Sequence, residues 1–435
     1  MKLFTKLISH ELISGSFYIF IGSMFANFLA FLLNLFLARS LTYADYAIFA
    51  SLLSVITLAS IPAGCLNPIM VKFGTDYFVK EQYEKLKTLY LSFFKFILGF
   101  CLLIIVIFSV FGVFIGDFLR IDNVWYVIVA GLAISAFYLN TLNGAFLQSL
   151  LKFKFISFLN ATGGVVKLII GVILVMLGYK AFGGLWAVFF MTFAMYLLAY
   201  LPLNKIISSK SSGKTLSLNV GEMFSYALPT FVTVLFLTSF TSTDVILVKH
   251  FFDPHLAGFY AGLSLVGKVI FYFTAPIPMV MFPLLIKRHA TGRSFNNLFY
   301  LSLILVIFPS LAITAFYFAV PNFVINLFLG GREYLSVAKY LGMFGLYLTV
   351  FSMVNVCVYF FLSLHKTRIG IYVVLAAIAQ ILLIFSFHSN FYEVIGVSLL
   401  VSSILFIVLL YEFLRNYGSF GKLKESIAFL NNPNI

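Results

Sequence analysis

The sequence predicts an all-α integral membrane protein with about twelve transmembrane helices in two six-helix lobes. Composition is the first indication, since 62% of the residues are hydrophobic and 10% are charged, whereas a soluble domain carries about a quarter charged residues. Spacing is the second, because uncharged runs such as Phe96–Ile115 and Leu375–Phe387 recur along the whole chain. The runs are apolar on every side, which excludes the alternating strands of a membrane barrel.

Each span is expected where an apolar run lies between two charged connections. A hydrocarbon core of roughly 30 Å takes about 20 helical residues to cross, and a helix satisfies its own backbone hydrogen bonds in lipid. The runs that meet this length lie near residues 15–38, 46–71, 90–115, 124–149, 158–178, 184–203, 223–248, 257–286, 297–319, 336–362, 370–388 and 393–414.

The distribution of the basic residues predicts the orientation of the chain. The formal net charge is +14, and most Lys and Arg residues fall in alternate connections, counted from the N-terminus. Lys80, Lys85 and Lys87 share one such connection, whereas the next one carries Arg120 alone. By the positive-inside rule both termini are cytoplasmic. Because the basic residues are dispersed over many short loops, the charge reflects topology, and we expect no nucleic-acid partner.

A polar, Ser- and Lys-rich stretch at Asn204–Val220 divides the chain into near-equal halves. Its composition is typical of a flexible linker. We therefore expect an N-terminal six-helix lobe at residues 1–203, a cytoplasmic linker at 204–221, and a C-terminal six-helix lobe with a short tail at 222–435.

The two halves resemble each other weakly. At a shift of 211 residues Glu11 falls on Glu222, and at a shift of 214 the segment SLLKFK of residues 149–154 falls on SLHKTR of residues 363–368. Six spans per half bring both halves in from the cytoplasm, so they form a parallel repeat about an axis along the membrane normal. Two such lobes suit an alternating-access transporter. A twelve-helix bundle without internal duplication is the alternative.

Several functional classes are excluded by what the chain lacks. Cys65, Cys101 and Cys357 lie within apolar runs, which gives neither a disulfide framework nor metal-ligand spacing. SSKSSGKT, residues 208–215, lacks the first glycine of a Walker A motif and follows no strand. We therefore expect a transporter rather than an enzyme, with no catalytic residues, metal site or cofactor, driven by an ion gradient or by the gradient of its substrate.

Two segments carry a resemblance to a known family. Residues 36–55 read FLARSLTYADYAIFASLLSV, and residues 244–269 read DVILVKHFFDPHLAGFYAGLSLVGKV. They resemble the Wzx-type polysaccharide flippases of the multidrug/oligosaccharidyl-lipid/polysaccharide (MOP) exporter superfamily, and the resemblance covers the whole chain in length, span number and loop pattern. Ala47 replaces the commoner glycine of that family. The matching residues are Ala38, Arg39, Leu41, Asp45, Tyr46, Ala47, Asp244, Gly258 and Tyr260.

The resemblance implies a function and a setting. It implies a MATE-like fold and a flippase that moves an undecaprenyl-pyrophosphate-linked oligosaccharide across the bacterial cytoplasmic membrane. The product would be O-antigen (lipopolysaccharide), capsule or exopolysaccharide, and the partners a polysaccharide polymerase and a chain-length regulator. A cation-coupled small-molecule exporter of the same superfamily is the alternative, and a non-transporting membrane scaffold is a third possibility.

Cations inside the spans are the candidate ligands of the pyrophosphate. Lys167 and Lys268 lie well within predicted helices, and Arg39 lies at the outer end of the first. Charges in spans are costly and usually face a cavity or a partner. A lysine binds phosphate as a point charge and an arginine binds it with two hydrogen bonds. The alternatives are snorkelling or a structural pair for the lysines and an interfacial anchor for Arg39. These cations favour the flippase over the drug exporter.

Asp244 is the acid placed most clearly within a span. It lies in FTSTDVILVKHFF, a little over one turn before Lys249. A carboxylate there can couple transport to H⁺ or Na⁺, and the neighbouring hydroxyl groups of residues 241–243 supply further oxygens. It can instead form a structural pair with Lys249 or with another cation.

Overall fold

A computed structural model describes residues 11–207, 220–290, 296–364 and 366–417. Within these ranges every regular element is a helix. Eleven helices are long and apolar enough to cross a membrane, or up to twelve when one bent pair counts as a single span. Side chains such as Phe114 and Phe308, 72% and 77% exposed, lie on the outside of the bundles, as expected of a surface that faces lipid. The predicted all-α membrane fold is confirmed.

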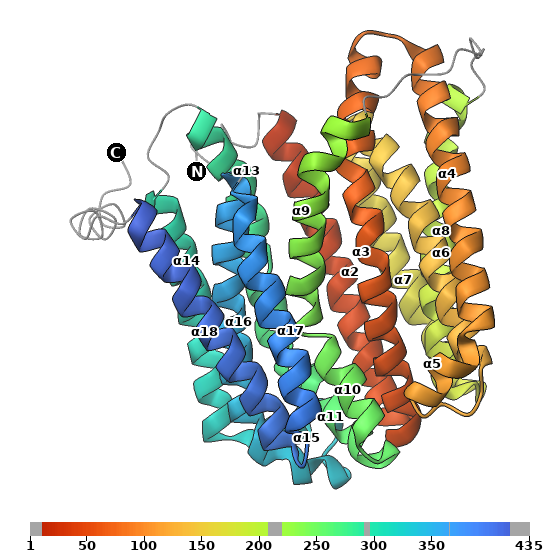
Figure 1. The fold of residues 1–435 in the computed structure, drawn as a ribbon. Helices are drawn as coiled ribbons and strands as arrows, with labels where there is room; N and C mark the ends of the chain where they lie inside the picture. Colours follow the sequence, from red (N-terminus) through yellow and green to blue (C-terminus); the bar gives the residue numbers. More distant parts are fainter. Residues whose placement is uncertain (1–10, 208–219, 291–295, 365, 418–435) are drawn as a thin grey trace. The chain divides into compact units, whose positions relative to one another are not determined.

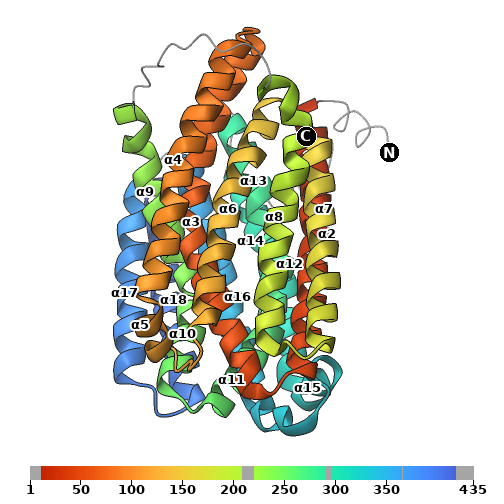
Figure 2. The ribbon, with the colours of Figure 1, turned by 90° about the vertical axis from the view of Figure 1, so that its right-hand side faces the viewer.

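The chain separates into two compact units, which are described one at a time. Unit 1 comprises Met1–Ala227 together with Phe252–Gly258. Its helices are α2 (Glu11–Ser40), α3 (Tyr43–Val79), α4 (Tyr83–Val110), α5 (Gly112–Phe118), α6 (Trp125–Ser149), α7 (Phe153–Met176) and α8 (Lys180–Ile207). α6 packs against α3, α4 and α8, and α2 packs along α7. Figure 2 shows α6, α7 and α8 side by side.

Small residues explain why α6 is the centre of unit 1. Ala130, Ala133 and Ser135 are buried on it, and small side chains let membrane helices approach closely. A Cβ atom added at Gly131 would lie 2.7 Å from the Phe108 side chain of α4. The close packing of α4 on α6 therefore depends on this glycine.

Unit 2 comprises Leu228–Phe251 and Phe259–Ile435. Its main elements are α9 (Val220–Ser239), α10 (Thr243–Phe251), α11 (Pro254–Gly267), α12 (Val269–Thr274), α13 (Pro276–Ala290), α14 (Asn296–Ala319), α15 (Pro321–Leu329), α16 (Ala338–Ser363), α17 (Gly370–Ser386) and α18 (Phe391–Tyr417), with short 3₁₀ turns at Arg332–Val337 and Thr367–Ile369. α16 packs against α12, α13, α14 and α18, and α10 packs against α17 (Figure 1). The unit boundary therefore falls inside α9, and the first residues of α11 belong to unit 1.

The two units share one order of elements and one set of helix pairs. α2 packs on α7 as α10 packs on α17, α6 packs on α8 as α16 packs on α18, and α4 packs on α6 as α14 packs on α16. The turns that end α6 and α16 agree as well, because Lys152 N–H donates to Leu147 O at 3.0 Å and Lys366 N–H donates to Phe361 O at 3.0 Å. These matching contacts support an internal duplication. The lobe limits at 203 and 222 stay a prediction, and residues 208–219 of the linker lie outside the described ranges.

The helices of unit 2 are interrupted where those of unit 1 are continuous. α9 and α10 meet at a 48° bend between Ser239 and Thr243, whereas their counterpart α2 is one helix. α12 gives way to α13 at Ala275, directly before Pro276, which has no N–H to donate. Irregular backbone inside a membrane protein is tolerated where protein or a cavity satisfies it.

Candidate functional site

Asp244 lies at the start of α10, directly after the bend, and its side chain is fully buried. The Tyr260 hydroxyl donates a hydrogen bond of 2.9 Å to Asp244 Oδ2. Asp244 Oδ1 is buried and has no hydrogen-bond partner of good geometry among the residues that the structure describes. Asp244 lies in the first turn of α10, where the helix dipole favours a negative charge. The carboxylate is therefore only partly satisfied by the described part of the protein.

The bend leaves a backbone carbonyl that side chains satisfy. The Tyr347 hydroxyl on α16 donates to Phe240 O at 2.6 Å, and Gln380 Nε2 on α17 donates to the same carbonyl at 3.2 Å. Gln380 Nε2 also donates to Ser398 Oγ at 2.9 Å. Two other helices, α16 and α17, thus place polar groups at the break.

Lys268 stands next to this cluster. It separates α11 from α12, and its side chain is half-buried. It interacts electrostatically with Asp244, yet no ion pair within 4.0 Å joins the two side chains. Lys268 and the carboxylate therefore form no closed ion pair.

One face of α11 faces the carboxylate. Tyr260, Ser264 and Lys268 follow one another at intervals of four residues, which places them on one side of the helix. Ser264 Oγ is buried and, like Asp244 Oδ1, has no partner among the described residues. Within this stripe Tyr260 is the residue that contacts the carboxylate directly.

Lys249 lies in the last turn of α10, and its side chain is 1% exposed. The sequence predicts Lys249 as one possible partner of Asp244. The structure gives Lys268 as an electrostatic partner of that carboxylate. The sequence predicts that Lys268 binds the substrate and that Asp244 binds an ion. The structure gives the two residues an electrostatic interaction.

Lys167 is a buried cation of unit 1. It lies on α7 and is 6% exposed, and no hydrogen bond or ion pair to it is found among the described residues. Gly164 and Gly171 share its face of α7, and added Cβ atoms there would meet Ala26 and Leu33 of α2. Lys167 therefore lies on the face of α7 that α2 approaches, with a charge that no described neighbour balances.

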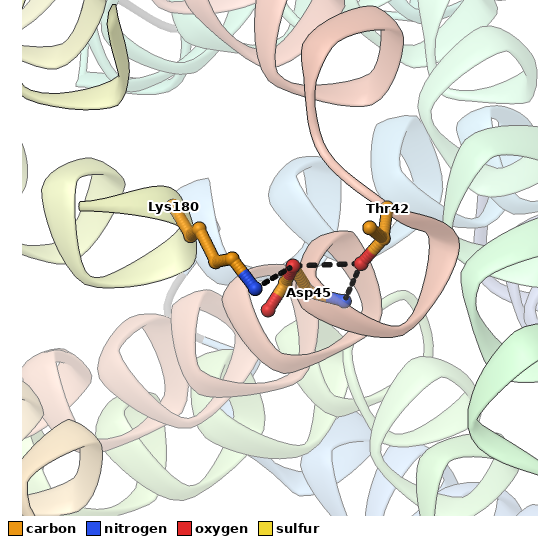
Figure 3. Close-up of polar contacts among 3 residues, drawn as sticks. All are labelled: Thr42, Asp45 and Lys180. Atoms are coloured by element: carbon orange, nitrogen blue, oxygen red, sulfur yellow. Dashed lines mark hydrogen bonds and ion pairs between the residues drawn. The ribbon is translucent and has the colours of Figure 1, made fainter. Parts of the chain in front are cut away.

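Arg39 lies apart from Lys167, exposed in the last turn of α2. Just beyond it the Thr42 hydroxyl donates to Asp45 Oδ2 at 2.7 Å, and Asp45 N–H donates to Thr42 Oγ1 at 3.2 Å. Lys180 Nζ lies 3.5 Å from the same carboxylate oxygen (Figure 3). Thr42 therefore caps α3, and Asp45, a residue of the family pattern, joins the start of α3 to the start of α8.

Sequence reasoning gave no role to Tyr260, Ser264, Tyr347 and Gln380. Two features of the sequence could have predicted some of these residues. Gln380 is an isolated amide in an otherwise apolar run, and Tyr260 and Ser264 are spaced four residues apart. The role of the Phe240 carbonyl could not be predicted from the sequence, because this carbonyl is left free only by the bend. Within the described ranges no group of three or more His, Cys, Asp or Glu side chains could hold a metal ion. A cation at Asp244 would therefore be held by one carboxylate together with hydroxyl and carbonyl oxygens.

Two comparisons show which known proteins the chain is similar to. A family described as "Polysaccharide biosynthesis protein" matches residues 36–339. An uncharacterised membrane protein of Methanocaldococcus jannaschii is 23% identical over 429 residues, which cover 93% of this chain and 98% of that protein. The relative and this chain thus correspond over nearly their whole lengths.

Solved structures show the same fold. An inward-facing multidrug resistance MATE family transporter of the MOP superfamily aligns with a TM-score of 0.70 at 12% identity, over 88% of this chain and 93% of that one. The lipid II flippase MurJ in an inward closed conformation aligns with a TM-score of 0.66 at 17% identity, over 89% and 86%. Because the family match spans most of the chain, the protein belongs to the polysaccharide biosynthesis protein family, with the fold of the MOP-superfamily transporters.

Proposed function

We propose that the protein is a flippase that moves a lipid-linked oligosaccharide across the cytoplasmic membrane by alternating access. The observation that carries this proposal is Lys167, a buried lysine inside a span with no balancing anion among the described residues. An uncompensated cation in a low-dielectric region is costly unless a ligand supplies the opposite charge. A pyrophosphate group does so, and the lipid tail can stay in the bilayer while the sugars pass through the protein.

The family description and the fold support the same reading. Polysaccharide biosynthesis requires glycan units to cross the membrane, and the chain shares its fold with a lipid II flippase. The undecaprenyl carrier, the product class (O-antigen, capsule or exopolysaccharide) and the polymerase and chain-length partners are parts of the proposal. The proposed location is the cytoplasmic membrane of a bacterium.

The second part of the proposal is ion coupling at Asp244. Its Oδ1 atom has no good hydrogen bond among the described residues, and the Phe240 carbonyl and the Tyr347 hydroxyl lie at the same break in the helix. A carboxylate with carbonyl and hydroxyl oxygens suits H⁺ or Na⁺. Asp244 therefore takes up the coupling cation in this account.

A small-molecule exporter is the second candidate function. Its support is the fold of multidrug MATE transporters, with which the chain aligns over most of its length. In that case Lys167 would be a structural residue and the transported molecules would be cationic or neutral.

Reconstituted vesicles separate the two. The purified protein should translocate a fluorescent lipid-linked oligosaccharide and should not concentrate a cationic dye. Transport of the dye alone would favour the exporter. Lys167→Met should lose translocation of the lipid-linked oligosaccharide, and Lys95→Met is its matched control, because Lys95 is an exposed lysine in another span.

The orientation is tested independently. We expect reporter fusions at Lys210 and Arg293 to report the cytoplasm and a fusion at Asn390 to report the outside, since the basic connections are cytoplasmic. The first two positions lie outside the described residues, so the test rests on the sequence alone. If Lys210 and Asn390 report the same side, the twelve-span topology is wrong.

A further inference from the structure

One face of α8 in unit 1 carries an unbroken row of aromatic side chains. Successive members are four, three, four, three and four residues apart, which keeps them on one side of a helix. Because 19% of the residues in the chain are aromatic, composition alone does not account for six successive aromatic positions on one face. The members of this aromatic row are Phe182, Trp186, Phe189, Phe193, Tyr196 and Tyr200.

Neighbouring rings of the aromatic row contact one another along the helix. The ring centroids of Phe182 and Trp186 are 6.0 Å apart, and those of Trp186 and Phe189 are 5.3 Å apart. Phe189 and Phe193 stack at 5.6 Å with their planes 10° from parallel, and Phe193 continues to Tyr196 at 6.5 Å. These are the separations of favourable aromatic pairs, so the rings orient one another and form one continuous apolar surface.

The packing of α8 on its neighbours does not explain the aromatic row. α8 lies between α6 and α7 (Figure 2), and its buried positions include the small residues Ala181, Ala187 and Ala199. Small residues are what closely packed membrane helices use at their contacts. The aromatic row is instead half-buried or exposed, with Phe193 at 38% and Tyr200 at 40% exposure. It therefore lies on a side of α8 that the described helices leave partly open.

The length of the aromatic row matches the thickness of a membrane. From Phe182 to Tyr200 the helix rises about 27 Å, at about 1.5 Å per residue, and the hydrocarbon core is roughly 30 Å thick. Aromatic belts of membrane proteins lie at the two interfaces, whereas Phe189 and Phe193 lie near the middle of α8. The aromatic row is therefore more than an interfacial belt, because it reaches from one leaflet to the other.

We propose that the aromatic row binds the polyprenyl tail of the transported lipid and guides it from the inner to the outer leaflet. This inference rests on the proposed function, in which the tail stays in the bilayer while the sugars pass through the protein. A tail that changes leaflets needs contacts at every depth, and the row supplies a ring at every turn. The negative ring faces attract C–H groups, and flat rings pack on the methyl branches and double bonds of the tail. Lys167 lies on α7, which packs against α8, so adjacent helices hold the head group and the tail.

Trp186 makes the proposed contact measurable by fluorescence. The chain has two tryptophans, Trp125 and Trp186, so Trp125→Phe leaves one emitter, inside the aromatic row. The full chain is placed in phosphatidylcholine nanodiscs with a small fraction of undecaprenyl phosphate that carries a nitroxide on its tail, or with the same fraction of phosphatidylcholine that carries this nitroxide. The polyprenyl probe should quench Trp186 roughly 2–10-fold more strongly, the equivalent of one aromatic contact. Unlabelled undecaprenol should reverse the excess, and inorganic pyrophosphate should not.

Variants separate the aromatic row from ordinary contact with lipid. Adding Trp186→Phe and Phe308→Trp to Trp125→Phe moves the emitter to a position of α14 that is 77% exposed, where the two probes should quench equally. Phe189→Ala combined with Phe193→Ala should abolish the excess quenching of Trp186 and slow flipping of the lipid-linked oligosaccharide by roughly 2–10-fold. Leu197→Ala is the matched control, because Leu197 is exposed on α8 outside the row. Thermal melting shows whether each variant is folded.

Two results overturn the proposal. Equal quenching of Trp186 by the two probes would make the aromatic row an ordinary lipid-facing surface. Emission that depends on the number of protein copies in a disc, and not on the polyprenyl probe, would make it a contact between two copies of the chain.

Failure of the proposed function gives a different result. If the polyprenyl probe quenches Trp186 in excess but the native protein does not flip the lipid-linked oligosaccharide, the tail contact is confirmed and the flippase assignment is wrong. If the native protein flips the lipid and the Phe189→Ala, Phe193→Ala variant flips it equally fast, the flippase assignment stands and the guiding role does not. Lys167→Met should lose flipping and keep the excess quenching, because it leaves the aromatic row intact.

Discussion

Unit 1 and unit 2 repeat the same helix pairs, yet they treat equivalent positions differently. At the shift of 211 residues Asp244 of unit 2 corresponds to Leu33 of unit 1, and both are fully buried. Tyr260 corresponds in the same way to Phe49. The unit with continuous helices fills these places with apolar side chains, and the unit with the bend fills them with a carboxylate and a phenol.

The difference shows how one topology can serve two roles. A bend frees a backbone carbonyl, and unit 2 satisfies it with Tyr347 and Gln380 while it gathers charge around the break. Unit 1 keeps α2 and α3 regular and holds the buried cation Lys167 on the face between two glycines. We infer that unit 1 contributes a static anion site and that unit 2 contributes the responsive, ion-dependent site.

The largest effect is expected from removing the cation of unit 1. Lys167→Met should lower flipping of the lipid-linked oligosaccharide by roughly 10–150-fold, the equivalent of about 1.5–3 kcal/mol of charge-assisted hydrogen bonding. The protein level and the melting temperature should stay near those of the native protein, because a buried charge has been replaced by an apolar side chain of similar length. Vesicle flipping assays measure the effect, with Lys95→Met as control. Native activity in Lys167→Met would remove this lysine from the site.

The next effect tests the packing that positions Lys167. In Gly164→Val the new side chain meets Ala26 Cα, which lies 2.9 Å from an ideal Cβ at this position. Overpacking of this kind should cost about 1–3 kcal/mol of stability. Gly144→Val on α6 is the matched control, since nothing lies within 4 Å of a Cβ there. Equal melting temperatures for the two variants in detergent would show that α2 does not press on α7 at this point.

A smaller effect is expected at the site of unit 2. Asp244→Asn keeps the size of the side chain and a hydrogen bond with Tyr260, but that bond no longer involves a charged group. The variant should lose about 1–2 kcal/mol of stability, the difference between a charged and a neutral hydrogen bond. The loss stays well below the cost of breaking a closed buried ion pair, about 3–5 kcal/mol, because Asp244 forms no such pair with any described residue. A loss of that larger size, restored by also replacing Lys268, would indicate a purely structural pair.

The smallest effect is expected at the ion pair that joins α3 to α8. The Lys180 side chain is 62% exposed and that of Asp45 is 14% exposed. Exposed pairs contribute about 0–1 kcal/mol, so Lys180→Ala should change the melting temperature little and leave flipping intact. A strong loss of flipping in this variant would make the pair part of the transport machinery and would weaken the division between the units.

Much of the fold could be read from the sequence, and particular residues show why. Long uncharged runs determine the spans, because lipid admits only helices of that length. The break at Ala275 was also readable, since Pro276 and Pro278 cannot donate backbone hydrogen bonds. The bend between Ser239 and Thr243 was not, because neither a proline nor a glycine stands at the break.

The candidate site was read only in part. Intramembrane charge identified Lys167, Lys268 and Asp244, since each is costly in lipid. The electrostatic interaction of Lys268 with Asp244 could not be predicted from the sequence, because it depends on which face of α11 meets α10. The sequence allowed a pairing of Asp244 with Lys249 on one helix, whereas the side-chain hydrogen bond of the carboxylate comes from Tyr260 on α11.

The most direct test of the account measures transport and its ion response together in the same reconstituted vesicles. We predict that the native protein flips the lipid-linked oligosaccharide and responds to Na⁺ or H⁺, that Lys167→Met loses flipping while it still binds the cation, and that Asp244→Asn loses the cation response while it still binds the pyrophosphate. Flipping at native rates in Lys167→Met, together with a native ion response in Asp244→Asn, would contradict the division of roles between the two units.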